Sequence, residues 1–130
     1  MDYVALVIVL ALVQYFFFTG MVGKARGKYS INAPATTGDE MFERYFRVQQ
    51  NTLEQLIIFI PSIYLFGHYV HALAAAGIGV FFLIGRMIYF KGYVSDPSRR
   101  GKGMAIGFCA FAILLLGALV GIILALFKTL

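Results

Sequence analysis

The sequence predicts an all-α integral membrane protein, a four-helix bundle formed by one domain that covers residues 1–130. Of its residues, 61% are hydrophobic and only 13% are charged, a balance that soluble domains of this size do not show. Long stretches also lack the polar residues with which a water-soluble fold would cover its surface. We therefore expect a lipid bilayer to surround most of the chain.

The first two spans are expected at about residues 3–22 and 42–68. The first has no positively charged segment before it and no small-residue cleavage site after it, so we interpret it as a retained helix and not as a signal peptide. A polar connection follows and ends at Asp39 and Glu40, an acidic pair that favours the N-terminus of a helix. The second span is amphipathic at first and then apolar.

The third and fourth spans are expected at about residues 72–94 and 103–127. A tight turn precedes the third span, and a loop that contains Pro97 and Gly101 separates it from the fourth. Each apolar stretch is long enough to cross a bilayer as a helix. Four spans with short connections use the whole chain, so no separate soluble domain is expected.

The basic residues indicate how the chain lies in the membrane. All but one of the 11 flank the first and third connections, and only Lys128 falls on the other side. The positive-inside rule therefore predicts that these two connections are cytoplasmic and that both termini are not. Because the basic residues border apolar spans and form no exposed basic domain, we expect no nucleic-acid partner.

A polar stripe marks the start of the second span. Arg44, Arg47, Asn51 and Glu54 fall within about 80° of one another on a helix. At the edge of a bilayer, Glu54 requires a cavity or a cationic partner. The stripe predicts a binding site, although Glu54 could instead pair with an arginine only to hold two helices together.

The third span repeats this pattern near the same membrane face, with Arg86, Tyr89 and Tyr93 spaced three and four residues apart. The alternative is that the tyrosines belong to an interfacial belt and the arginine extends toward lipid headgroups. Taken together, the arginines, one acid, amides and phenols suit an anionic ligand that carries one amine. No metal site is expected, because His68 and His71 lie at the opposite face without further ligands.

These spaced residues resemble the MAPEG family, the membrane-associated proteins of eicosanoid and glutathione metabolism, over nearly the whole chain. The motifs are most similar to the branch of microsomal glutathione transferase 2-like and leukotriene C synthase-like proteins. The residues that carry the resemblance are Phe42-Glu43-Arg44, Arg47, Gln49, Asn51, Glu54, Arg86 and Tyr89-Phe90-Lys91-Gly92-Tyr93.

The resemblance implies a homotrimer that uses glutathione as a co-substrate and no metal. It implies glutathione contacts from Arg47, Asn51, Glu54, Tyr89, Tyr93 and Arg100, with Arg26 and Gln49 supplied by the adjacent subunit. Arg100 is expected to be the catalytic residue, because a guanidinium favours the glutathione thiolate, the form that attacks electrophiles. The other partners are membrane lipids and a hydrophobic electrophilic acceptor.

Two residues depart from the pattern of the synthase-like members. Gln55 stands where they have a tyrosine, and Gly27 stands where leukotriene synthase has a second arginine, so leukotriene synthesis is not expected. The expected function is conjugation of glutathione to hydrophobic electrophiles, with glutathione-dependent peroxidase activity considered beside it. The first alternative is a non-catalytic lipid-binding or scaffold member like the five-lipoxygenase-activating protein. The second is a small channel or transporter that uses Arg47 and Glu54 as a relay.

Overall fold

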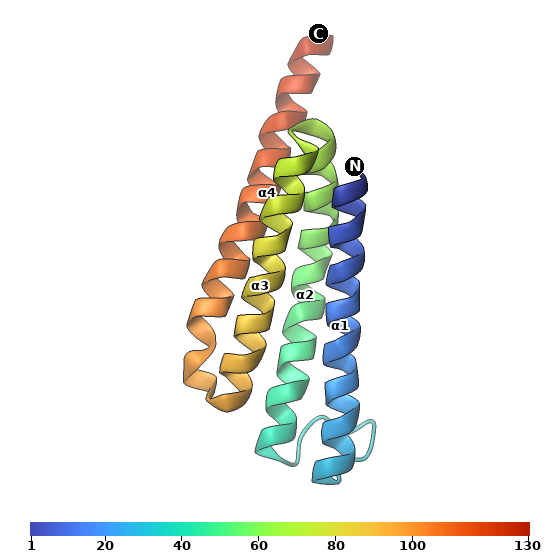
Figure 1. The fold of residues 1–130 in the computed structure, drawn as a ribbon, viewed down its shortest axis with the longest axis vertical. Helices are drawn as coiled ribbons and strands as arrows, with labels where there is room; N and C mark the ends of the chain where they lie inside the picture. Colours follow the sequence, from blue (N-terminus) through green and yellow to red (C-terminus); the bar gives the residue numbers. More distant parts are fainter.

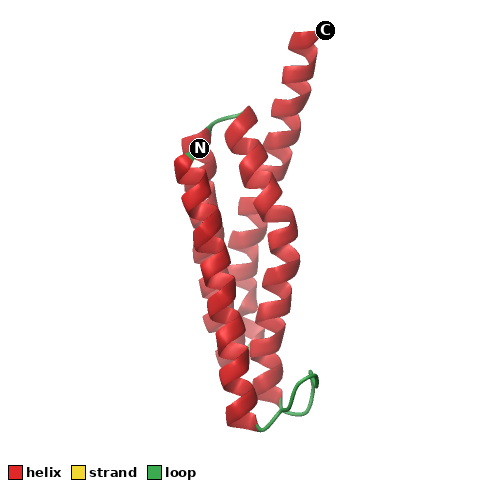
Figure 2. Cartoon of the chain, turned by 90° about the vertical axis from the view of Figure 1, so that its right-hand side faces the viewer, coloured by secondary structure: helices red, strands yellow, loops and turns green.

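The computed structural model describes all 130 residues as a bundle of four α-helices with one short 3₁₀ helix and no strand (Figure 1, Figure 2). The elements are α1 (Asp2–Tyr29), α2 (Glu40–Tyr69), α3 (Ala72–Ser95), η1 (Pro97–Arg100) and α4 (Gly101–Thr129). Both termini lie at one end of the bundle, whereas the α1–α2 loop and η1 lie at the other (Figure 1). The all-α four-helix prediction is confirmed.

Helix α1 is longer than the span predicted at residues 3–22, because it continues through Gly23 and Gly27 to Tyr29. Arg26 and Lys28 lie in its last turn, where cations interact favourably with the helix dipole. Ser30 then ends the helix in the left-handed conformation, with φ 58°. The basic segment that the sequence assigned to a polar connection is therefore largely helical.

The ends of α2 and α3 are fixed by side-chain caps. The Asp39 carboxylate accepts a hydrogen bond of 2.9 Å from the Phe42 backbone N–H, which confirms that this acidic pair begins the second helix. At the other end of the bundle, His71 Nδ1 accepts from the Ala74 backbone N–H at 3.1 Å and caps α3. His71 thus has a structural role in the tight turn between α2 and α3.

Three helical segments are long and apolar enough to cross a membrane, namely Asp2–Tyr29, Ala72–Ser95 and Pro97–Thr129. Helix α2 is not among them, since the polar residues of its first half lower its hydropathy. This result fits an integral membrane protein, and a fourth crossing by α2 stays a prediction.

Small residues let the helices approach closely, which is how bundles pack when lipid surrounds them. A Cβ atom at Gly85 of α3 would lie 2.7 Å from the Gly107 backbone nitrogen of α4. Gly117 of α4 packs against the Phe66 ring of α2 within the same chain. In the centre of the bundle, the rings of Phe59 and Phe82 stack at 4.0 Å between centroids.

Candidate functional site

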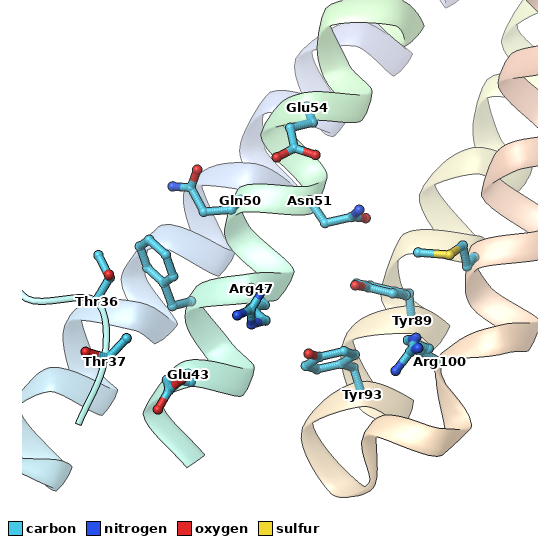
Figure 3. A pocket seen from close by; sticks show the side chains of 12 residues that line it. Thr36, Thr37, Glu43, Arg47, Gln50, Asn51, Glu54, Tyr89, Tyr93 and Arg100 are labelled. Atoms are coloured by element: carbon cyan, nitrogen blue, oxygen red, sulfur yellow. The ribbon is translucent and has the colours of Figure 1, made fainter. Parts of the chain in front are cut away.

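A pocket of about 560 Å³ opens at the end of the bundle that carries the α1–α2 loop and η1 (Figure 3). Its walls come from that loop, α2, α3, η1 and the start of α4. It is lined by Thr36, Thr37, Glu43, Phe46, Arg47, Gln50, Asn51, Glu54, Tyr89, Tyr93, Arg100 and Met104. Six of the eight residues expected to contact glutathione therefore line one pocket within a single chain.

Helix α2 supplies the polar wall of the pocket. Arg47, Asn51 and Glu54 project from successive turns, as their spacing predicted (Figure 3). The Oδ1 atom of Asn51 is buried and has no hydrogen-bond partner in the chain, a state that costs free energy unless a ligand or water supplies a donor. Gln50 also lines the pocket and was missed, although its spacing of three from Arg47 and four from Glu54 places it on the same face.

Helix α3 and η1 form the facing wall. Tyr89 is buried and Tyr93 is half-buried, and their ring centroids lie 5.6 Å apart. Figure 3 shows both rings and Arg100 on the side of the pocket opposite α2. Arg100 is exposed, and its Nη1 donates to the Pro97 carbonyl at 3.2 Å.

Asp96 fixes the turn that holds Arg100. Its carboxylate accepts a hydrogen bond from the Ser98 backbone N–H at 3.1 Å. Hydrogen bonding with the backbone and side chain of Ser98 lowers the pKa of Asp96 below its usual value. Gly92 of α3 makes room for this turn, since a Cβ there would lie 2.7 Å from the Arg99 carbonyl oxygen. The close contact of η1 with α3 keeps Arg100 beside the two tyrosines.

Arg44 does not line this pocket, but it lines a smaller adjoining one together with Glu43, Arg47 and Tyr93. Its Nη1 donates to the carbonyls of Val94 and Ser95 at 3.0 and 3.3 Å. Its Nη2 forms the only ion pair within the chain, with Glu40 at 2.8 Å. The last carbonyls of α3 lack helical partners, so the Arg44 guanidinium satisfies two of them.

The two residues expected from a neighbouring subunit, Arg26 and Gln49, do not line the pocket of their own chain. Arg26 Nη1 donates to the Ala35 carbonyl at 2.7 Å and its guanidinium lies 4.9 Å from the Phe42 ring centroid. Gln49 Nε2 donates to Thr19 Oγ1 at 3.0 Å. Any contribution of Arg26 or Gln49 to a pocket therefore requires a second chain.

Arg86 does not line the pocket either, and it is fully buried. Its Nη1 donates to Gln55 Oε1 at 2.8 Å and its Nη2 to Thr52 Oγ1 at 2.9 Å. Gln55, which departs from the family pattern, thus has a defined partner. The spacing of Arg86 and Tyr89 suggested one shared face, but only the tyrosine reaches the pocket.

The pocket combines opposite charges with hydrogen-bond donors and acceptors. Arg47 and Arg100 are its cations, and Glu43 and Glu54 are its anions. Guanidinium groups hold carboxylates through paired hydrogen bonds, and a carboxylate receives an ammonium group. No group of three or more His, Cys, Asp and Glu side chains is placed to hold a metal ion. The arrangement suits a zwitterionic, peptide-like molecule.

A family model of the MAPEG family matches residues 4–120. The chain belongs to the MAPEG family. An uncharacterized protein of Synechocystis sp. is 44% identical over 119 residues, which cover 92% of this chain and 87% of that protein. Microsomal glutathione S-transferase 2 of Homo sapiens is 40% identical over 116 residues, covering 88% of this chain and 79% of that protein.

Leukotriene C4 synthase of Rattus norvegicus is 34% identical over 96 residues, which cover 74% of this MAPEG protein and 64% of the synthase. Microsomal glutathione S-transferase 2 and leukotriene C4 synthase are the members that name the branch indicated by the spaced motifs. The expected family membership is therefore confirmed, and two of the three relatives are named as enzymes.

Proposed function

We propose that this MAPEG protein is a membrane-bound glutathione transferase that conjugates glutathione to hydrophobic electrophiles. The observation that carries the proposal is the convergence of Arg47, Asn51 and Glu54 from α2 with Tyr89, Tyr93 and Arg100 from α3 and η1 around one pocket. The similarity to microsomal glutathione S-transferase 2 supports the same activity.

The pocket residues match the functional groups of glutathione, which has two carboxylates, one ammonium group and one thiol. Arg47 is suited to a carboxylate, and Glu54, which has no ion-pair partner in the chain, is suited to the ammonium group. The unpartnered Oδ1 of Asn51 is available to accept a hydrogen bond from a peptide N–H. The tyrosine hydroxyls provide further donors.

A trimer would complete this site. Within one chain the two arginines and two glutamates of the pocket balance each other, whereas glutathione carries one net negative charge. Arg26 of an adjacent copy would supply the missing cation, and Gln49 of that copy a further amide. This reasoning supports the homotrimer that the family resemblance implies.

Arg100 is the proposed catalytic residue. A guanidinium near the sulfur favours the thiolate, so the thiol proton leaves to solvent at lower pH. The thiolate then attacks an electrophilic carbon of the acceptor, forms a carbon–sulfur bond and displaces a leaving group or adds to a double bond. The same thiolate can attack the terminal oxygen of a lipid hydroperoxide, which breaks the O–O bond and releases the lipid alcohol. The glutathione sulfenic acid then reacts with a second glutathione to give glutathione disulfide and water, so both substrate classes belong in an activity screen.

The two substrates would reach the pocket by different routes. The pocket lies at the end of the bundle with the basic loop and η1, which the positive-inside rule assigns to the cytoplasm. Glutathione would enter from that side, and hydrophobic acceptors would reach the pocket from the bilayer. Both termini would then be non-cytoplasmic.

The test uses the purified protein in detergent. Calorimetric titration should detect glutathione binding, and incubation with glutathione and a small aromatic electrophile should yield the thioether conjugate. Binding with neither conjugation nor hydroperoxide reduction would favour a non-catalytic lipid-binding or scaffold role. Absence of glutathione binding would overturn the proposal.

A further inference from the structure

Arg86 is the one charged residue with a fully buried side chain. It lies between α2 and α3, where the Gln55 amide oxygen accepts from Nη1 at 2.8 Å and the Thr52 hydroxyl accepts from Nη2 at 2.9 Å. Both partners are neutral. The only ion pair in the chain joins Arg44 to Glu40, so no acid forms an ion pair with Arg86.

An isolated buried cation is costly, and proteins usually pair it with an acid. Here hydrogen bonds fix the guanidinium while its positive charge stays uncompensated. The Nε atom has no partner at all. An arginine that served only to join two helices would be better stabilised by a carboxylate at position 55. The neutral Gln55 therefore indicates that the positive charge of Arg86 has a function.

Arg86 contacts a residue that lines the pocket. The Arg86 guanidinium carbon lies 4.3 Å from the centroid of the Tyr89 ring, and Tyr89 lines the pocket. On α2, the two partners of Arg86 alternate with pocket residues, since Asn51 precedes Thr52 and Glu54 precedes Gln55. The buried cluster of Arg86, Thr52 and Gln55 therefore adjoins residues that line the pocket.

We infer that Arg86 is a positioning residue for the glutathione site: it holds the Tyr89 ring and provides a fixed positive charge next to the pocket that favours the bound thiolate. This inference rests on the proposed function. The charge of Arg86 adds to that of Arg100, which lines the pocket itself. The neutral side chain of Gln55 preserves the effect, because it binds the guanidinium without neutralising it.

The other charged and titratable groups of the site line the same pocket. They are Glu43, Arg47 and Glu54 from α2, Tyr89 and Tyr93 from α3, and Arg100 from η1. A unit charge about 10 Å away at an effective dielectric constant of about 20 shifts a pKa by roughly one unit. The Arg86 charge should therefore lower the thiol pKa, and its neutralisation should raise it.

The decisive variant is Gln55→Glu, which sets a carboxylate against Nη1 of Arg86 with almost no change in shape. We expect it to bind glutathione, to unfold no more readily than the wild type, and to raise the pKa of bound glutathione by about one unit in a thiolate absorbance titration. Arg86→Gln removes the positive charge and should raise the pKa of bound glutathione by a similar amount. Arg86→Lys keeps the charge and should restore most of the wild-type titration.

Thr52→Val is the matched control, since it removes one hydrogen bond to Arg86 without altering charge. A thiol titration in Gln55→Glu equal to that of the wild type, with glutathione still bound, would overturn the inference and leave the proposed function standing. The same holds if Thr52→Val shifts the titration as far as Gln55→Glu. If Gln55→Glu fails to fold, Arg86→Gln and Arg86→Lys decide the question, and identical titrations of those two would also overturn it. Failure of the wild type to bind glutathione would overturn both the inference and the proposed function.

Discussion

Gly103 is the position at which one methyl group should disturb the pocket most directly. A Cβ atom there would overlap the backbone of Tyr89 and lie 2.6 Å from the Gly85 carbonyl oxygen. These are backbone atoms of α3, which cannot rotate away as a side chain can. Gly103→Ala should therefore push α3 and α4 apart by about 1 Å, because carbon atoms in contact need about 3.5 Å or more.

The expected cost follows from two opposing effects. Overpacking of this kind destabilises a protein by about 1–3 kcal/mol, whereas replacing glycine by alanine in a helix stabilises it by up to about 1 kcal/mol. The net change should be a loss of roughly 1–2 kcal/mol. Because the overlap falls on Tyr89, glutathione affinity should fall as well.

The assay is thermal unfolding in detergent followed by circular dichroism, with glutathione affinity measured on the folded variant. Gly101→Ala is the matched control in the same turn of α4, since a Cβ atom there meets no other group within 4 Å. Gly101→Ala should be at least as stable as the wild type. Equal stability and equal affinity of the two variants would refute the reasoning.

Three further predictions concern the site and its orientation. Glu54→Gln should weaken glutathione binding by about 1–3 kcal/mol in calorimetry, the range for loss of a charged hydrogen-bond partner, whereas loss of folding with normal residual binding would mark Glu54 as a structural residue. Arg100→Ala should raise the pKa of the bound thiol and reduce turnover while much of the binding remains, with Arg99→Ala as the control; an unchanged titration would shift this role to Tyr93. A topology reporter fused after Leu130 should behave as non-cytoplasmic, and a cytoplasmic signal would invert the proposed orientation.

Much of the fold was predictable from local chemistry. Apolar stretches of spanning length predicted the helices, and the acidic pair at Asp39 and Glu40 located the start of α2 because a carboxylate caps free backbone N–H groups. The end of α1 was less predictable. The sequence predicted that the first span ends at about residue 22, yet the helix continues to Tyr29 and is capped by Ser30.

The site was predictable where helical spacing alone decides which way a side chain points. Asn51 and Glu54 therefore lie on one wall, as expected. Spacing could not predict which nearby group each arginine would bind. Arg44 turns to the last carbonyls of α3, and Arg86 turns to the side chains of Thr52 and Gln55 on α2. Those partners are distant in sequence and are brought near only by the fold.

Glutathione is expected to occupy the pocket between α2, α3 and η1. An experimental structure of the protein determined with glutathione tests this most directly. We expect a trimer in which one chain contacts glutathione through Arg47, Glu54 and Arg100. Arg26 and Gln49 of the adjacent chain should complete the contacts, with the sulfur nearest Arg100. Glutathione bound elsewhere, or a site closed by one chain alone, would contradict the account.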